Sequence, residues 1–267
     1  MRRLPRRLWL AVVPGAMILA ALLAWNGGLG RSRGVADETW ARVQREGVLR
    51  VGMDASYPPF EVQGGGQFQG YDVDLAREIG RRLGLQVSFV NVPFDGLYDA
   101  LAAERCDVLV SALPYEAQRT RDVLYTGGYF NAGQVLMVRR EERRIQSYRD
   151  LGGCQVAVEL GSVAHQEALR LRDAERIALT IEAVPSSEEA FDLVQAGKAD
   201  AALADRITAR LALRERPGLA LRGAPLTDES FVIAVARGSP DLHAALNGVL
   251  NALRGEGWLD SLADRWL

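Results

Sequence analysis

Short apolar runs alternate with amphipathic segments along most of this chain, and this alternation limits the fold more than any other feature. In a first series, apolar runs of strand length occur at residues 48–53, 86–92 and 106–113. Residues 74–84 lie between two of these runs, and their apolar side chains recur at every fourth position before Gly84. This spacing predicts a helix that ends at the glycine, and strands joined through helices predict an α/β layer with a largely parallel sheet.

A second series repeats the alternation. Apolar runs at residues 154–160, 178–185 and 199–204 predict strands, and residues 163–172 and 186–198 between them predict helices.

Two segments of the two series match closely. In "LYDALAAERCDVLVSA" and in "AFDLVQAGKADAALAD", a helix leads into a short strand that opens with an aspartate, Asp107 or Asp200. We therefore predict two α/β lobes of one architecture, each with a mostly parallel sheet flanked by helices.

The chain ends in two helical stretches, residues 241–257 and 258–267. Amphipathic helices need an apolar surface to cover, and we expect these two to cover the sheet of the first series. The chain then crosses between the lobes twice, near residues 131–134 and 224–227, and two crossings form a hinge. The predicted segments are residues 40–131 plus 228–267 for lobe 1 and residues 132–227 for lobe 2.

The N-terminal segment differs in kind from the rest. Residues 1–25 combine an arginine cluster with an apolar run from Leu8 to Trp25, which is typical of a signal peptide or an N-terminal membrane anchor. Both alternatives stay open, because the run is near the minimum length of a membrane span. Residues 26–39 predict a flexible linker. We expect an exported chain, periplasmic or at the cell surface, that is released or anchored to the outer face of the cytoplasmic membrane.

Composition excludes several other functions. The net charge of the 267 residues is -2, which indicates no nucleic-acid partner. Cys106 and Cys154 lack the spacing of a metal site, and we expect small buried hydrophobes, with one disulfide between them as the alternative. The sequence carries no catalytic or phosphate-binding motif, and we expect neither cofactor nor metal. His165 and His243 are expected in helices, away from the binding loops.

Ligands bind open α/β sheets beyond the carboxyl ends of the strands, and here those positions hold an arginine, carboxylates and aromatic rings. Such a set suits a small zwitterion, because a guanidinium binds a carboxylate, an acid binds an ammonium and rings enclose the remaining atoms. Free N–H groups at the start of the helix after residue 162 also favour an anion. The candidate ligand-binding residues are Asp54, Tyr57, Phe94, Ser111, Ala112, Arg119, Glu159, Ser162, Val163 and Asp205.

Several candidates have a structural alternative. Arg119 is otherwise a solvated loop arginine, and Asp205 is otherwise the N-cap of the next helix, a role compatible with ligand contact. Tyr57 and Phe94 are otherwise core aromatics, and Asp54 and Glu159 are otherwise solvated loop acids. We expect Asp72 to be a helix cap or a structural hydrogen-bond partner.

Six stretches together resemble the family 3 extracellular solute-binding proteins, which bind polar amino acids for ABC transporters. They are "LRVGMDASYPPFE", "GYDVDLAREIGRRLG", "FDGLYDAL", "RTRDVLYTGGYF", "LGS" and "QAGKADAALAD". The resemblance implies the type II periplasmic-binding-protein fold, in which two α/β lobes joined by two hinge strands close on the ligand.

The resemblance also implies roles for the candidates. Arg119 would grip the ligand α-carboxylate, Asp205 would take the α-ammonium, and two rings would clamp the ligand. The rings are Tyr57 and Phe94; side-chain contacts would come from Asp54, Ser111 and Glu159, and the small-hydroxyl loop carries Ser162.

Two positions depart from the family pattern. Pro114 stands where the family has a Thr or Ser that donates to the ligand carboxylate, and Val163 stands where it has a second hydroxyl. Carboxylate binding should then rest more on Arg119 and on backbone N–H groups.

We therefore expect a monomeric, non-enzymatic binding protein that delivers an amino-acid-like ligand to the permease of an ABC transporter. If Asp54 and Glu159 both face the ligand, they favour a basic side chain such as that of arginine, lysine or ornithine. The alternatives are an enzyme resembling cyclohexadienyl or arogenate dehydratases on the same fold, and a ligand-sensing module for a separate receptor chain.

Overall fold

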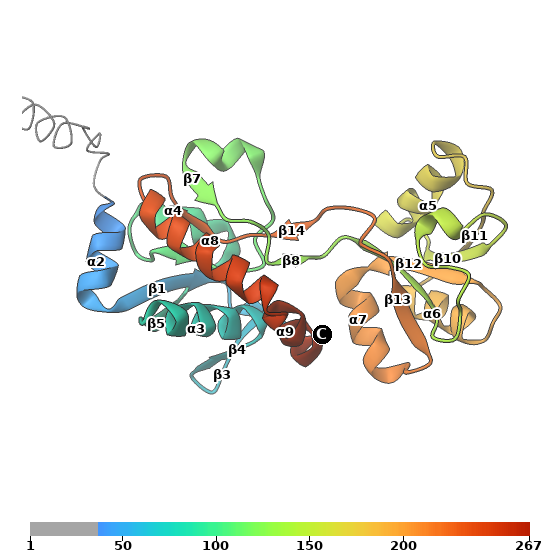
Figure 1. The fold of residues 1–267 in the computed structure, drawn as a ribbon, viewed down its shortest axis with the longest axis horizontal. Coiled ribbons are helices and arrows are strands. Elements are labelled where there is room, and N and C mark those ends of the chain that lie inside the picture. The colour runs from blue at the N-terminus through green and yellow to red at the C-terminus, as the bar shows by residue number, and fades with distance from the viewer. Residues whose placement is uncertain (1–36) are drawn as a thin grey trace, which may run out of the picture. The chain divides into compact units, whose positions relative to one another are not determined.

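The computed structural model describes residues 37–267, which contain two five-stranded sheets (Figure 1). The predicted N-terminal signal or anchor and nearly all of the predicted linker lie outside these residues. In the first sheet, the reversed strand is β15, which pairs antiparallel with both of its neighbours. The strand order is β5 (Gln86–Asn91), β1 (Val48–Met53), β6 (Val108–Leu109), β15 (Ala234–Ala236) and β7 (Val123–Tyr125).

The second sheet repeats this plan. Its reversed strand is β9, again the fourth in the sheet, while β10 pairs parallel with its two neighbours. The strand order is β11 (Thr180–Val184), β10 (Gln155–Glu159), β12 (Ala201–Asp205), β9 (Gln134–Arg139) and β13 (Leu219–Arg222). The predicted two-lobed fold with mostly parallel sheets is confirmed, and each reversed strand follows a crossing of the chain from the other lobe.

Helices flank both sheets. Lobe 1 has α3 (Tyr71–Leu83), α4 (Leu97–Ala102), α8 (Pro240–Gly255) and α9 (Trp258–Trp266), and lobe 2 has α5 (Val163–Asp173), α6 (Ser187–Gln195) and α7 (Arg206–Glu215). Buried leucines of α8 and α9, such as Leu246 and Leu262, share one core with Leu49 and Val51 of β1. The C-terminal helices therefore pack in the same core as β1.

Two short antiparallel strands, β8 (Phe130–Asn131) and β14 (Ser230–Phe231), form the hinge. Beyond them the two crossing segments stay in contact, because the Gln134 N–H donates to Thr227 Oγ1 at 2.8 Å. The segments approach so closely at Gly133 that a Cβ there would lie 2.1 Å from the Thr227 carbonyl oxygen. Only glycine fits at this position.

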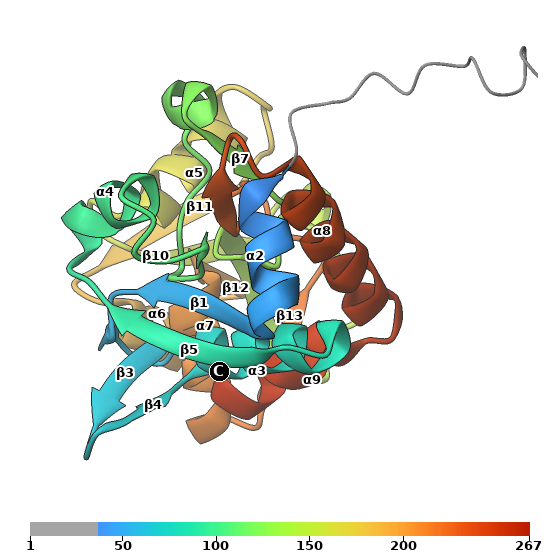
Figure 2. The same ribbon diagram turned by 90° about the vertical axis from the view of Figure 1, so that its left-hand side faces the viewer.

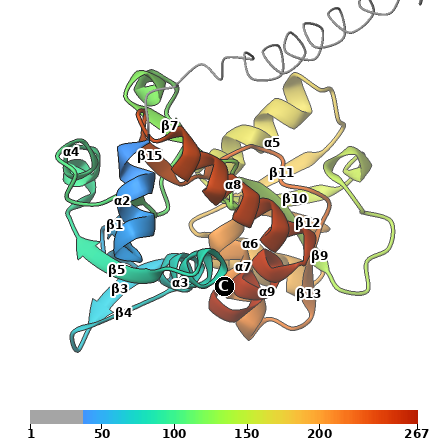
Figure 3. The same ribbon diagram turned by 60° about the vertical axis from the view of Figure 1, so that its left-hand side comes forward.

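Two regular elements do not follow from the hydrophobic pattern. Helix α2 (Glu38–Glu46) begins inside the predicted linker and packs against β1 and α8 (Figures 2 and 3). Its N-cap Asp37 accepts from Trp40 N–H at 2.8 Å and also from two N–H groups at the start of α8. A small sheet of β2 (Ser56–Tyr57), β3 (Glu61–Gly64) and β4 (Gln67–Gln69) follows β1.

Two further details refine the predictions. The strand predicted over residues 106–113 is limited to β6, because the chain turns away from regular pairing after Leu109. Cys106 and Cys154 are both buried and free, so the disulfide alternative is wrong. No helix among residues 37–267 has the length and apolar character that a membrane span requires.

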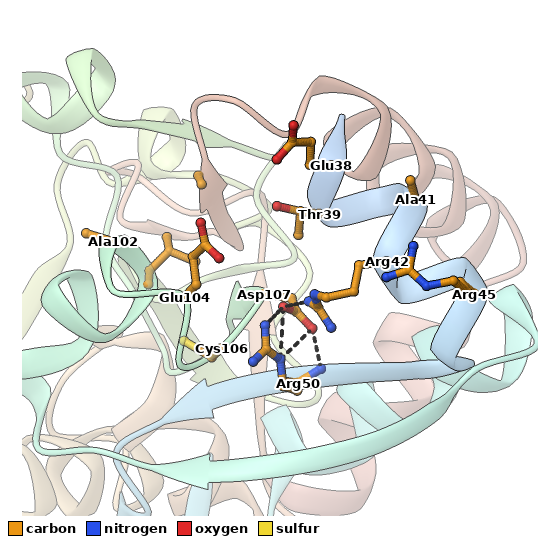
Figure 4. A pocket seen from close by; sticks show the side chains of 12 residues that line it. Glu38, Thr39, Ala41, Arg42, Arg45, Arg50, Ala102, Glu104, Cys106 and Asp107 are labelled. Atoms are coloured by element: carbon orange, nitrogen blue, oxygen red, sulfur yellow. Dashed lines mark hydrogen bonds and ion pairs between the residues drawn. The ribbon is translucent and has the colours of Figure 1, made fainter. Parts of the chain in front are cut away.

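The matched aspartates of the two lobes make the same backbone contacts. Asp107 accepts from the Arg50 N–H of β1 at 2.8 Å, and Asp200 accepts from the Gln155 N–H of β10 at 2.9 Å. Asp107 is buried and also bonds the guanidinium groups of Arg42 and Arg50 (Figure 4). It thereby ties α2 to the sheet, at the edge opposite to the carboxyl ends of the strands.

Replacing Asp107 with Ala should lower the free energy of unfolding by about 2 to 3 kcal/mol, because two partly buried guanidinium groups lose their shared counter-ion. Asp200→Ala is the matched control. It removes the same backbone acceptor from a more exposed site, and we expect a loss of about 1 kcal/mol. Urea denaturation followed by far-UV circular dichroism measures both variants, and equal losses would contradict this account.

Candidate functional site

Four exposed large hydrophobic side chains lie beyond the carboxyl ends of sheet strands. Tyr57 and Phe94 are 47% and 44% exposed, so the alternative that they are core aromatics is wrong. Leu160 and Val163 follow β10 and are also exposed, at 65% and 51%. Apolar groups at matched strand ends of both lobes are expected where a ligand will cover them.

In lobe 1, Asp54 organises the loops that follow β1 and β5. Its Oδ2 accepts from the Phe94 N–H at 2.9 Å, and its own N–H donates to Ser111 Oγ at 2.9 Å. Its Oδ1 accepts from Ser56 Oγ at 2.7 Å. The structure thus joins three candidates, Asp54, Phe94 and Ser111, in one network, and the Asp54 carboxylate already has two partners. Tyr57 stands beside them, stacked on the buried ring of Phe60 at 5.8 Å.

Arg119 lies on the 3-10 turn Ala117–Arg121, after β6. Its guanidinium carbon lies 4.0 Å from the centroid of the Tyr98 ring, and its Nε donates to Glu116 Oε2 at 3.2 Å. The side chain is 43% exposed. Arg119 is therefore held in place at the surface, which argues against a freely solvated loop arginine. Pro114, at the base of this loop, pairs with Phe231 of hinge strand β14.

In lobe 2, Glu159 is the counterpart of Asp54. Its Oε2 accepts from the N–H and the hydroxyl of Ser187, at 3.1 and 2.8 Å, at the start of α6. Asp54, which follows β1, and Glu159, the last residue of β10, thus each bind the beginning of the helical segment that follows the neighbouring edge strand, β5 or β11. These contacts give both acids a structural role at a helix start. They also keep the negative charges at the carboxyl edge of each sheet, where we expect the ligand.

The loop before α5 corrects two predictions. Ser162 is the N-cap of α5 and accepts from the His165 N–H at 3.1 Å, while Nδ1 of the same histidine accepts from the Gly161 N–H at 3.1 Å. His165 is thus part of the loop, because one helical turn brings it back over residue 161. The N–H groups of Gly161 and Ser162 are used internally, so fewer are free for an anion than expected.

Asp205 ends β12 and is the N-cap of α7. Its Oδ1 accepts from the Thr208 N–H at 2.9 Å, which confirms the cap. Its Oδ2 makes no hydrogen bond within residues 37–267 and stays available. The pKa of Tyr57 is raised first by burial and then by the negative charge of Asp205. The charge of this lobe 2 acid therefore acts on an aromatic ring of lobe 1. No hydrogen bond or ion pair among the described residues joins a candidate of one lobe to a candidate of the other.

Two buried acids, Glu61 and Asp72, support the candidate segment Ser111–Ala112 from below. Ser111 Oγ donates to Glu61 Oε1 at 2.8 Å, and the Ala112 N–H donates to Asp72 Oδ2 at 2.6 Å. Ala112 has a φ of 43°, a left-handed conformation that alanine rarely adopts, and the bond to Asp72 holds it there. Asp72 is thus a structural hydrogen-bond partner, as expected, although the N-cap of α3 is Gly70.

Glu61 Oε2 and Asp72 Oδ1 are both buried, and neither atom has a hydrogen-bond partner among the described residues. Burial, followed by the charge of Asp72, raises the pKa of Glu61, and burial raises the pKa of Asp72. The Tyr129 hydroxyl donates to Asp72 at 2.8 Å, which favours the ionised form of Asp72 over that of Glu61. Sequence reasoning missed Glu61, because nothing in the sequence distinguishes it from a surface acid.

Two similar sheets with matched strand-end loops, a two-strand hinge, a guanidinium on one lobe and an available carboxylate on the other define the class of two-lobed binding proteins. The sequence model of bacterial extracellular solute-binding proteins, family 3, matches residues 49–267, and the chain belongs to this family.

Curated relatives bind amino acids. The chain is 28% identical over 228 residues to the L-cystine-binding protein TcyJ of Escherichia coli, covering 84% of each chain. It is 31% identical over 230 residues to an L-arginine-binding protein of Pseudomonas aeruginosa, covering 82% of this chain and 87% of the relative.

Solved structures agree with the fold. An ancestral cationic amino acid solute-binding protein is 30% identical, with a TM-score of 0.58, and the match covers 86% of this chain and 99% of that one. An ancestral cyclohexadienyl dehydratase is 24% identical, with a TM-score of 0.77, and the match covers 87% and 97%; at this identity the likeness concerns the fold alone.

Replacing Glu61 with Gln should change how stability depends on pH. Because the folded pKa of Glu61 is raised, its favourable contribution is complete below the pKa of the unfolded chain and is lost as pH rises toward the folded value. Glutamine keeps an oxygen that accepts from Ser111 Oγ, and it does not titrate. From pH 5 to pH 9, unfolding free energies should therefore move in favour of the variant by at least about 1 kcal/mol. Parallel pH profiles in urea denaturation would contradict the raised pKa of Glu61.

Proposed function

We propose that this protein captures an amino acid between its two lobes and delivers it to the permease of an ABC transporter. One observation carries the proposal: Arg119 in lobe 1 and Asp205 in lobe 2 each leave charged atoms without a partner, and the two charges are opposite. A zwitterion satisfies both charges only when the lobes close, so binding drives closure. The exposed rings of Tyr57 and Phe94 supply apolar contact to the ligand between these charges.

A cationic side chain suits the remaining charges. Asp54 and Glu159 stand at the matched strand ends, and both carry carboxylates whose helix contacts leave their negative charge in place. Together with Asp205, they outnumber the guanidinium of Arg119, the one positively charged group among the candidate ligand-binding residues. Arginine, lysine or ornithine would balance this excess, and the names of several relatives support the same class.

The proposal extends to the way the protein works in the cell. The family is extracellular, and we infer that the N-terminal segment directs export and is then removed or kept as an anchor. We also infer that the protein is monomeric and non-catalytic. Enzymatic turnover of prephenate or arogenate would contradict the inference that the protein is non-catalytic.

Replacing Arg119 with Ala should weaken the binding of L-arginine by about 2 kcal/mol or more, because a charge-assisted pair with the α-carboxylate is lost. Arg121→Ala is the control, since it removes the same charge from the same 3-10 turn.

A thermal-shift screen with all amino acids comes first; a ligand at 100 times its Kd stabilises the fold by about 2.7 kcal/mol. Isothermal titration calorimetry then compares the variants, and an unchanged affinity of Arg119→Ala would remove this residue from the site.

Asp205→Asn should separate ligand binding from stability. Asparagine is as good an N-cap as aspartate, so α7 keeps its cap and the melting temperature stays near that of the wild type. The charge that holds the α-ammonium is lost, and affinity for L-arginine should fall about ten-fold or more. Asp205→Ala, which also removes the cap, should lower both quantities. Full affinity in the Asn variant would show that Asp205 acts only as a cap.

A further inference from the structure

We propose that Tyr98 and Glu116 are positioning residues, which hold the Arg119 guanidinium so that its Nη1–Nη2 edge remains free for the ligand carboxylate. The inference rests on the proposed function, because it assigns the parts that orient the anion-binding arginine of the same site. Neither residue was among the candidates from the sequence.

Tyr98 supplies a flat support. It lies in α4, and the guanidinium carbon of Arg119 lies 4.0 Å from its ring centroid, well within the range of a cation–π contact. The ring is itself fixed, because its hydroxyl shares a hydrogen bond of 2.8 Å with the Tyr125 hydroxyl on β7. Burial raises the pKa of Tyr98, so this hydroxyl stays neutral.

Glu116 fixes the rotation of the guanidinium in its plane. Arg119 Nε donates to Glu116 Oε2 at 3.2 Å, and the same oxygen accepts from Gln118 Nε2 at 3.3 Å. A guanidinium offers one edge with Nε and another with Nη1 and Nη2. With Nε engaged by Glu116, the outer edge makes no hydrogen bond within residues 37–267, and this edge has the fork geometry that matches a carboxylate.

Holding the arginine in advance matters more in this chain because of Pro114. The residue at this position has no side-chain donor and no N–H, so Arg119 has less help from the loop in orienting a carboxylate. An arginine side chain that is already ordered loses less conformational entropy when the ligand binds. The stacking ring and the Nε contact thus take over part of the orienting role.

Glu116 has an alternative role with the opposite consequence. If its carboxylate competes with the ligand for Arg119, removing it should tighten binding. The two roles differ in how they rank two variants. Positioning predicts that Glu116→Ala binds L-arginine more weakly than Glu116→Gln, because glutamine still accepts from Nε. Competition predicts that Glu116→Ala binds at least as tightly as Glu116→Gln, and that ranking would overturn the role of Glu116.

The main test uses Tyr98→Leu and Tyr98→Phe. Both variants lose the hydroxyl, but only leucine loses the aromatic face. Calorimetric titration with L-arginine should show affinity reduced about three- to ten-fold in Tyr98→Leu, and Tyr98→Phe should restore most of it. L-argininamide, in which an amide replaces the carboxylate, should lose much less affinity in Tyr98→Leu than L-arginine does. Equal losses for both compounds would overturn the proposal, because a general structural defect weakens them alike.

A measurement without ligand separates this inference from the proposed function. The Nε–H signal of Arg119 in nitrogen-15 NMR spectra is identified by its loss in Arg119→Lys. The Tyr98 ring current should shift it, and the shift should vanish in Tyr98→Leu and persist in Tyr98→Phe. If no amino acid binds the wild-type protein but this pattern holds, the proposed function fails while the orientation of Arg119 stands. If amino acids bind and the pattern is absent, the positioning role fails alone.

Discussion

The structure depends on the paired crossing of the chain at β8 and β14. Asn131 opposes Ser230 and Phe130 opposes Phe231, so the segments that leave and re-enter lobe 1 are hydrogen-bonded to each other. Lobe 1 is incomplete before the second crossing, because β15 and the helices α8 and α9 all follow it. Lobe 1 is therefore built from two segments of the chain, and lobe 2 is inserted between them. Pro114 pairs with Phe231 of β14 and so connects the Arg119 loop directly to the hinge.

At the carboxyl ends of β1 and β10, a carboxylate binds the start of a later helical segment. Asp54 and Glu159 make this contact in lobes 1 and 2. Negative charge at a helix N-terminus is favourable, so a residue that stabilises the loop also brings an acid to the ligand-binding edge. Asp205 and Ser162 serve as caps in the same way. The local stability of the strand-end loops and the charge of the site thus come from the same side chains.

Much of the fold follows from the sequence because it depends on periodic burial. The pattern predicts β1 at its observed bounds and places α3, α5, α8 and α9 within a few residues, since their apolar faces repeat regularly. The hydrophobic pattern does not predict helix α2, because Val43 is its only fully buried residue. Its stability comes from Asp37, which accepts hydrogen bonds at the starts of two helices. A contact between residues 37 and 241 leaves no mark on local periodicity.

The candidate site also has one part that the sequence predicts and another that it does not. Positions after strands could be predicted from topology, and the structure finds exposed aromatics and charged groups there, while their contact with a ligand stays a prediction. The supports could not be predicted, because Glu61 meets Ser111 and Tyr98 meets Arg119 only after the sheet has formed.

The supports bear on ligand choice. A binding site that holds a carboxylate with several hydroxyl and N–H donors selects by hydrogen-bond geometry, because an unpaired donor is costly to bury. With Pro114 and Val163 at two such positions, this chain has fewer side-chain donors to satisfy. Under the proposed function, selection rests on the net charge of the ligand and on its fit between exposed rings. The excess of carboxylates among the candidate residues then supports our proposal of a cationic ligand.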